Sequence, residues 1–465
     1  MLRVALAASL LSVAAQQGGT APSPQTASPQ PGAPVQPPPE VQQRPSPPPP
    51  NALTLERAIQ LALQGNYDLR RAQYQELTAE QTLVTARANI LPKLDFNGSL
   101  IRIRQGTGTQ VVGGVPIPVA AHIFNQYSGT VTVRQLVFDG GNWWNNLKAA
   151  SLALQSSQAS IEEQRLTTIY TVEQRFYELI RQQRQLKVLG DAAQRSRDQA
   201  DFTQRLFEGG RATQADVYAA RANRDNDEIN RLGQEARVEL ARQDLALTVG
   251  VPPAEPLAIV EPDAMKQDPT APPPARDAVD KALSQRPSLK AFALTVESQM
   301  KAASAAKGAY WPQISLVGTY GRSTSDLGEF TDSDLGQNSQ LTGGVQLSWN
   351  IFNGLATKAA VETAEINILL GVNDLENGRR TVASDVERAI AQLAVARQQA
   401  RIAAQTEQTS SENLRLARTR QQVGVGTQLE VRDAELKLTQ SELARANALV
   451  DGHEAESALR RATGG

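Results

Sequence analysis

The 465-residue sequence contains no cysteine, only two histidines, and aromatic residues that make up 5% of the chain. Without cysteine there is no disulfide framework and no thiol nucleophile, and we expect no lipid attached to an N-terminal cysteine. His122 and His453 are too few for a His/Cys metal cluster and leave little basis for a Ser-His-Asp site. We therefore expect a protein that is not an enzyme and that binds no metal or cofactor.

Long apolar runs and an excess of one charge are also missing. No apolar stretch reaches the ~18 residues that a transmembrane helix needs. The 47 Lys and Arg residues nearly balance the 48 Asp and Glu residues, for a net charge of −1. Because a nucleic-acid partner favours a basic face, we expect no nucleic acid among the partners.

The first 50 residues have a composition unlike the rest. Residues 1–15 contain one arginine, an apolar run and small residues at the end, which is typical of a secretory signal peptide. Residues 16–50 are rich in Pro and Gln, and half of the chain's 26 prolines fall within residues 20–50. This composition predicts an extended, disordered linker.

The remainder contains a duplication. The stretch "VRQLVFDG" at 133–140 reappears as "LSWNIFNG" at 347–354, which is 214 positions later. The stretch "ANILPKLDF" around Pro92 matches "GAYWPQISL" around Pro312, 220 positions later. Such a period is far too long for a solenoid repeat. We predict two copies of one half-domain, residues 51–250 and 276–465, joined by a linker at 251–275.

Each half contains a predicted helix that is too long for a globular domain. Residues 141–207 and 355–422 contain no proline, and apolar residues recur every three or four positions. At 1.5 Å per residue, about 68 residues span about 100 Å, which favours a coiled coil or a helical tube. Shorter helices are predicted to stack in pairs beside the long ones, at 67–89 with 213–248 and at 287–308 with 427–461.

Four segments alternate polar and apolar residues and are predicted strands: 93–103, 127–138, 313–321 and 340–352. The alternation is typical of a membrane barrel and equally of a soluble antiparallel sheet. All four tryptophans lie at junctions between these strands and helices, as expected at a membrane interface: Trp143, Trp144, Trp311 and Trp349. Outer-membrane barrels need at least eight strands, so we expect several chains to share one barrel.

The order of helix, strand, strand, "F[DN]G" and very long helix, with the paired glycine turns, resembles the TolC-like outer membrane efflux proteins. The resemblance covers about residues 51–465. It implies a mainly α fold with a membrane β-sheet: a homotrimer with a 12-stranded barrel in the outer membrane above a 12-helix periplasmic tunnel. It also implies a periplasmic adaptor protein and an inner-membrane pump as partners, contact with outer-membrane lipid, and the function of an exit duct for small molecules.

The resemblance also implies which residues close and contact the tunnel. The family's acidic gate positions fall on Asp216, Glu430 and Asp433, whereas its gate Arg and Tyr fall on Gly426 and Gln421, so the usual latch groups are absent. Without the resemblance, Glu430 and Asp433 are simply carboxylates that suit the N-terminus of a helix. Two turns are expected to contact the adaptor protein, through Glu208, Gly209, Gly210, Gly424 and Gly426.

Two other functions stay open at this stage. The duct could serve type I protein secretion instead of small-molecule efflux. A protein of a different class, a structural coiled-coil protein of the envelope, would also contain long helices and a small sheet. Neither alternative is excluded by composition or periodicity.

Overall fold

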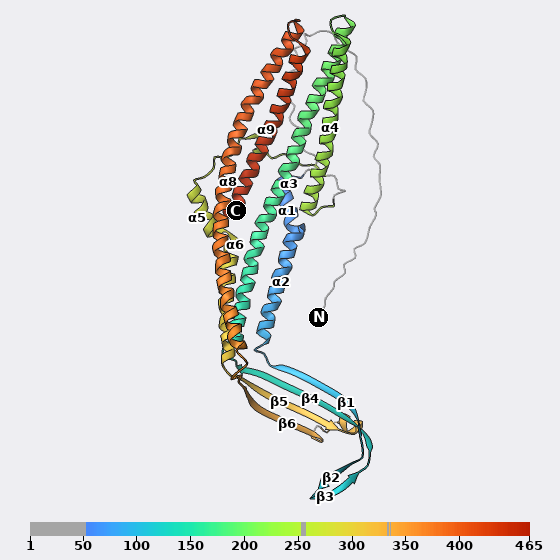
Figure 1. Ribbon diagram of the computed structural model, residues 1–465, viewed down its shortest axis with the longest axis vertical. Helices are drawn as coiled ribbons and strands as arrows, with labels where there is room; N and C mark the ends of the chain where they lie inside the picture. The colour runs from blue at the N-terminus through green and yellow to red at the C-terminus, as the bar shows by residue number, and fades with distance from the viewer. Residues whose placement is uncertain (1–52, 253–256, 333, 335) are drawn as a thin grey trace, which may run out of the picture. The chain divides into compact units, whose positions relative to one another are not determined.

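The computed structural model describes residues 53–252, 257–332, 334 and 336–465 (Figure 1). The expected signal peptide and the Pro- and Gln-rich linker lie outside the described residues, as do residues 253–256 of the predicted linker between the halves. The described residues belong to one compact unit that begins at Pro50.

The first half contributes four helices, and polar caps explain where three of them begin. The helices are α1 (Leu55–Gly65), α2 (Tyr67–Ala88), α3 (Asn142–Glu208) and α4 (Gln214–Val249). Thr54, Asn66 and Thr213 each accept a hydrogen bond from a backbone N–H of the first turn that follows, which satisfies donors that lack a partner within the helix. With 67 residues, α3 spans about 100 Å.

The second half has the same order of long and short helices. Its helices are α5 (Ala275–Gln285), α6 (Pro287–Lys307), α8 (Ala356–Gln422) and α9 (Gln428–Thr463), with 3-10 turns η1 (Asp263–Lys266) and η2 (Gly308–Tyr310). Like α3, α8 has 67 residues. The predicted helix boundaries agree with these to within two residues.

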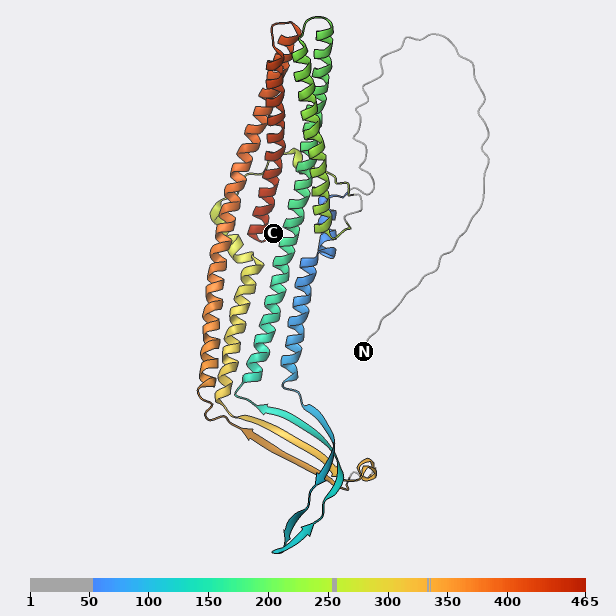
Figure 2. The same cartoon turned by 45° about the vertical axis from the view of Figure 1, so that its right-hand side comes forward.

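The short helices stack end to end beside the long ones, as predicted, with α2 and α4 along α3 and with α6 and α9 along α8 (Figure 2). In the first half the Asn66 Nδ2 donates to the Thr248 carbonyl at 3.2 Å. Gly250 has a φ of 82°, and a Cβ there would lie 2.9 Å from the Gly65 oxygen. Gly464, with a φ of 94°, meets Gln285 in the corresponding way.

The core lies along the long helices. Around α3 it includes the fully buried Val172, Phe176 and Leu179, and around α8 it includes Val386 and Leu393. Many other buried positions are alanine, and small side chains let helix axes approach closely. In the described part of the chain, no helix is both long enough and apolar enough to cross a membrane.

Four antiparallel strands form a sheet in the order β1-β4-β5-β6. They are β1 (Lys93–Gln105), β4 (His122–Phe138), β5 (Gln313–Thr324) and β6 (Ser339–Ser348). The prediction that the last strand reaches Phe352 is wrong, because β5 begins at Gln313, whose partner is Ser348, and residues beyond Ser348 have no strand to pair with.

The segment between β1 and β4 contains a second hairpin, which was not among the four strands predicted from the sequence. Strands β2 (Gly108–Val112) and β3 (Val115–Val119) are joined by Gly113 and Gly114. Both glycines have positive φ, 61° and 85°, as a two-residue hairpin turn requires. The other loop, between β5 and β6, contains the short helix α7 (Leu327–Thr331).

The strand register gives the sheet one apolar face and one polar face. The apolar face is defined by four residues from each strand: Leu94, Phe96, Gly98 and Leu100; Val133, Val131, Gly129 and Tyr127; Ile314, Leu316, Gly318 and Tyr320; Leu347, Val345, Gly343 and Leu341. The opposite face carries residues such as Asn97, Thr132, Thr319 and Thr342. Leu94 is 71% exposed and Leu341 is 80% exposed in the single chain.

Candidate functional site

Two helical hairpins end in tight turns at the far end of the long helices from the sheet. In the α3–α4 turn, the Arg211 N–H donates to the Leu206 carbonyl at 2.7 Å, and Gly210 has a φ of 71°. In the α8–α9 turn, the Val425 N–H donates to the Arg420 carbonyl at 3.0 Å, and Gly424 has a φ of 82°. Each turn therefore needs one glycine with left-handed backbone geometry.

Gly426 is required for a different reason. A Cβ at this position would lie 2.9 Å from both the Arg420 Cβ and the Gln421 backbone nitrogen. The backbone of the second turn therefore packs against the end of α8, and no side chain fits there. Gly426, which stands where the resemblance would place the gate arginine, thus occupies a position with little room for a side chain.

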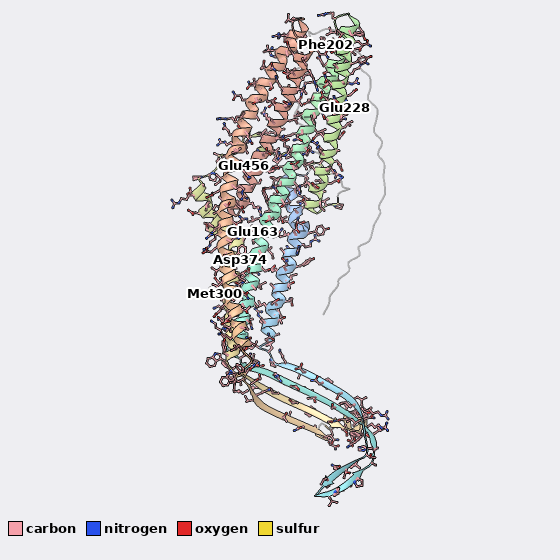
Figure 3. All side chains as sticks on the ribbon, in the orientation of Figure 1. Glu163, Phe202, Glu228, Met300, Asp374 and Glu456 are labelled. Atoms are coloured by element: carbon pink, nitrogen blue, oxygen red, sulfur yellow. The ribbon has the colours of Figure 1, made fainter. Side chains whose placement is uncertain are left out.

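A cleft of about 650 Å³ lies between the two turns. Its lining includes four of the predicted residues, Asp216, Gln421, Gly424 and Gly426, together with Arg211 and Gln428, among others. Phe202, which also lines the cleft, is labelled near the hairpin turns in Figure 3. The Gln428 Nε2 donates to the Asp216 carbonyl at 3.4 Å and so links the two hairpins.

The other predicted residues do not line this cleft. Glu208, Gly209 and Gly210 belong to the first turn, and Glu430 and Asp433 lie on α9. Of the predicted gate residues, Asp216, Gln421 and Gly426 therefore line the cleft. Glu430 and Asp433 are instead exposed on α9.

Each of the three predicted gate carboxylates has a partner within the chain. Asp216 accepts hydrogen bonds from the Thr213 hydroxyl (2.7 Å) and N–H (2.9 Å), which lower the pKa of Asp216. Glu430 Oε2 lies 3.7 Å from Arg420 Nε, and Asp433 Oδ2 lies 2.6 Å from Lys437 Nζ. The negative charge of Glu430 and Asp433 is thus partly compensated by neighbouring cations.

A stronger link, not predicted from the sequence, joins α9 to α4. Arg432 donates to both carboxylate oxygens of Asp227, at 2.7 and 3.1 Å. The two side chains are only 18% and 12% exposed, and the Ser196 hydroxyl of α3 also bonds Asp227. The two residues are 205 positions apart, so no local pattern could have revealed the pair.

More ion pairs connect α3 with α9 between this link and the middle of the helices. Arg195 bonds Glu442 at 2.9 Å, and Arg181 bonds Asp451 at 2.6 Å and Glu454 at 2.9 Å. Within the α8–α9 hairpin, by contrast, the contacts near the turn are made by Leu414, Ala417, Val431, Ala434 and Leu438. The contact between the hairpins near the turns therefore includes several ion pairs, whereas the α8–α9 hairpin also has an apolar cluster next to its turn.

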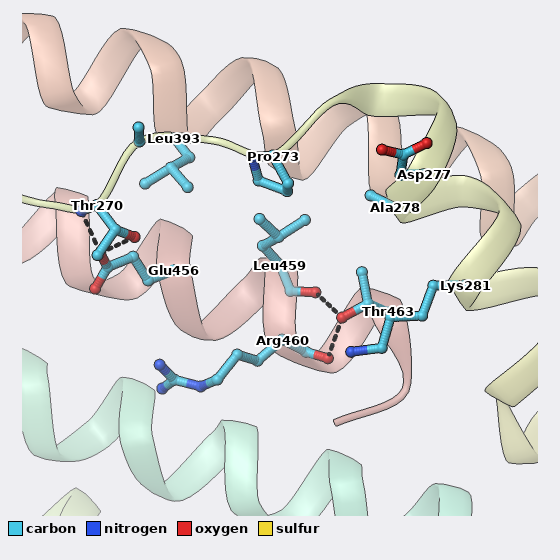
Figure 4. A pocket seen from close by; sticks show the side chains of 11 residues that line it. Thr270, Pro273, Asp277, Ala278, Lys281, Leu393, Glu456, Leu459, Arg460 and Thr463 are labelled. Atoms are coloured by element: carbon cyan, nitrogen blue, oxygen red, sulfur yellow. Dashed lines mark hydrogen bonds between the residues drawn. The ribbon is translucent and has the colours of Figure 1, made fainter.

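A second cavity, of about 470 Å³, lies where the linker after η1 crosses α9 (Figure 4). The Thr270 N–H and hydroxyl both donate to Glu456, at 2.5 and 2.7 Å. His453 Nδ1 lies 3.0 Å from the other oxygen of Glu456. Although burial opposes it, this set of partners lowers the pKa of Glu456 to about 2, so the linker is tied to an ionised carboxylate.

The four tryptophans lie where the strands meet the helices. The Trp143 and Trp144 rings are 5.3 Å apart, and the Trp349 Nε1 donates to the Tyr310 carbonyl at 3.2 Å. A Cβ on Gly140 would lie 2.7 Å from the Trp311 Cβ. Trp144, Trp311 and Trp349 are each about half exposed, which leaves their rings available to an environment outside the chain.

Comparison with known proteins gives a family match over most of the chain. The profile of the outer membrane efflux protein family matches residues 58–251 and 278–465. The chain is 26% identical to the toluene efflux pump outer membrane protein TtgC of Pseudomonas putida over 418 residues, which cover 88% of this chain and 83% of that protein.

Two further similarities agree with this match. The chain is 27% identical to the fusaric acid resistance protein FusA of Burkholderia cepacia over 320 residues, which cover 68% of this chain but only 59% of that protein. The fold is similar to the crystal structure of a membrane protein from Pseudomonas aeruginosa, with a TM-score of 0.77, 21% identity, and coverage of 88% of this chain and 92% of that one.

Proposed function

Because this chain belongs to the outer membrane efflux protein family, we propose that three copies assemble into one continuous duct with a 12-stranded barrel. The protein is an outer-membrane channel for efflux that extends into the periplasm, and its family is one of efflux channels, not enzymes. The copy number, the barrel and the partners are the proposed part.

The observation that carries the proposal is the sheet with two free edges. In the described part of the chain, β1 and β6 each pair on one side only, and the apolar face is exposed. Unpaired backbone groups cost several kcal/mol each in lipid, so β1 of one copy must pair with β6 of the next. Three copies of four strands make a 12-stranded barrel of even strand number, as outer-membrane barrels have.

The helices support the same assembly. At most levels each copy contributes two long helices and two short ones, so three copies make a ring of 12 helices. The matching junctions at Gly250 with Gly65 and at Gly464 with Gln285 support the proposal that residues 51–250 and 276–465 are two copies of one half-domain. The linker at 251–275 then runs around the middle of the tunnel.

The hairpin turns are the proposed contact with a periplasmic adaptor protein, which couples the duct to an inner-membrane pump. The turns at Glu208–Gly210 and Gly424–Gly426 lie at the ends of the long helices that are remote from the sheet (Figure 1). The cleft between them offers a polar recess for a partner. Photo-crosslinkers placed at Glu208 and Gly424 should capture the adaptor, whereas capture only from the β2–β3 hairpin would reverse the proposed orientation.

Small organic molecules are the proposed cargo, because the names of two relatives refer to toluene and fusaric acid. Deletion of the gene should increase sensitivity to such compounds. Loss of a secreted protein, with unchanged sensitivity, would favour the duct of type I protein secretion.

The assembly is tested with the full chain in detergent. We expect a trimer by native mass spectrometry that survives mild SDS, dissociates on heating, and conducts ions in a planar bilayer. A soluble, elongated oligomer that needs no detergent would instead favour a structural coiled-coil protein.

A further inference from the structure

The apolar face of the sheet ends before the end of each strand. On β1 and β4 it extends four residues further from the helices than on β5 and β6, because Tyr127 pairs with Thr324 whereas Tyr320 pairs with Val131. Beyond Leu100, Tyr127, Tyr320 and Leu341, the next residue on that face is polar in every strand: Arg102, Asn125, Arg322 and Ser339. These four residues lie toward the end of the strands that is remote from the helices. In the proposed barrel they mark the outer edge of the band that contacts lipid tails.

The two arginines at this edge have different surroundings. Arg322 is 7% exposed, and its Nη1 donates to the Asp332 carbonyl at 2.7 Å. The loop that contains α7 covers this region, since Phe330 of α7 lies 3.1 Å from the position of a Cβ on Gly129, on the apolar face. Arg322 therefore has a hydrogen-bond acceptor, the Asp332 carbonyl, within the loop that follows β5.

Arg102 has no such acceptor. Its guanidinium makes no hydrogen bond or ion pair within the part of the chain that the structure describes, and the same is true of Arg104, the next residue on that face. Both are exposed. The neighbouring segment 106–121 contains no charged residue. Two residues along a strand are about 7 Å apart, so the pair presents two neighbouring cations directly beyond the apolar band.

We propose that Arg102 and Arg104 bind the phosphate groups of a phosphorylated lipid in the outer leaflet, next to the lipid-facing side of β1. The proposal rests on the proposed function, because β1 faces lipid only within a membrane barrel. A guanidinium forms paired, charge-assisted hydrogen bonds with phosphate. The apolar residues Leu100 and Phe96 on the same face of β1 contact the acyl chains of the same lipid, which orients its headgroup toward the arginines.

The experiment uses purified wild-type trimers and the R102Q/R104Q variant in nanodiscs of phosphatidylcholine, with and without lipid A. The matched control is K93Q/R134Q, which removes the same charge from a facing pair at the other end of β1 and β4, on the polar face. Bound lipid A is counted by native mass spectrometry. Chemically dephosphorylated lipid A serves as the control ligand.

Wild type and K93Q/R134Q should retain lipid A in preference to the dephosphorylated form. R102Q/R104Q should lose this preference, with at least about tenfold weaker retention, since charge-assisted hydrogen bonds from guanidinium to phosphate are stronger than neutral ones. Equal retention by all three proteins would overturn the proposal. So would a trimer of R102Q/R104Q that is less stable in pure phosphatidylcholine, because the arginines would then pair with a neighbouring copy. If wild type forms no trimer, the proposed function itself fails, whereas an intact trimer without lipid preference contradicts only the lipid site.

Discussion

Arg432 of α9 and Asp227 of α4 form a two-point ion pair between the two helical hairpins, with N–O distances of 2.7 and 3.1 Å. Arg432 lies about one helical turn from the first residue of α9, and the pair is largely shielded from solvent. The resemblance led us to expect a latch without the usual arginine and tyrosine. The structure contains an arginine ion pair between the hairpins at another position, and we propose that this pair serves as the latch.

Breaking this pair should loosen the tunnel entrance. Asp227→Ala or Arg432→Ala leaves one charge partly buried without its partner, which costs roughly 3–5 kcal/mol for a buried pair. We expect larger open-channel conductance in planar bilayers. The control is Arg415→Ala, because its pair with Glu412 is more than half exposed and such pairs contribute about 0–1 kcal/mol. Conductance equal to wild type in both variants would mean that the pair does not hold the hairpins together.

The cation selectivity of the channel should depend on how much of the negative charge of Glu430 and Asp433 is neutralised by neighbouring cations. Glu430→Ala with Asp433→Ala removes two carboxylates per copy and should lower cation selectivity and the block by multivalent cations, as expected of an acidic ring. Arg420→Ala frees Glu430 from its neighbour at 3.7 Å and should change both properties in the opposite direction. Reversal potentials in a salt gradient measure this. If neither variant shifts them, these carboxylates only stabilise the start of α9.

Gly426→Ala should distort the second turn, because the new Cβ would meet the Arg420 Cβ at 2.9 Å. We expect lower thermal stability and weaker crosslinking to an adaptor. Gly190→Ala is the matched control, since nothing lies within 4 Å of its Cβ position in the middle of α3. There the substitution should stabilise the helix by up to ~1 kcal/mol. A Gly426→Ala protein as stable as Gly190→Ala would show that the turn has room to adjust.

The contact between hairpins should tighten as the pH falls. Burial raises the pKa of Glu435, Glu442 and Glu454 above the usual value despite their arginine neighbours. Hairpins that move apart expose these carboxyls to water and return each pKa toward 4.5. The packed arrangement thus binds protons more readily, and acidification toward and below pH 5 favours it. Conductance should fall over this range in wild type and change less in E435Q/E442Q/E454Q; an equally steep pH profile in that variant would contradict this origin.

The four tryptophans are expected to lie at one depth, at the periplasmic interface of the barrel. Their shared place at the junctions of strands and helices and the exposure of Trp144, Trp311 and Trp349 support this. Variants that keep a single tryptophan should show the same quenching by lipids brominated at a given depth. Widely different depths would contradict the membrane position of the sheet.

The sequence by itself determined the lengths of the helices and the alternation of the strands, because both follow from local periodicity. Helix α3 was predicted to within one residue at each end, since no proline interrupts it and glycines follow it. The β2–β3 hairpin was missed because Pro116 and Pro118 discourage a strand. In a two-stranded hairpin every second N–H points away from the partner, so prolines two positions apart are tolerated.

Only the tertiary structure decided which charges meet. Arg432 and Asp227 belong to different halves, and their contact depends on how α9 packs beside α3 and α4. The end of β6 at Ser348 depends on Gln313, a partner that is distant in the sequence. The tight packing at Gly426 depends on how closely the turn approaches the backbone at the end of α8, which residue types do not encode. Periodicity assigns each residue to a face of its own element, but the partner of that face is set by packing between elements, and the candidate gate is built from such partners.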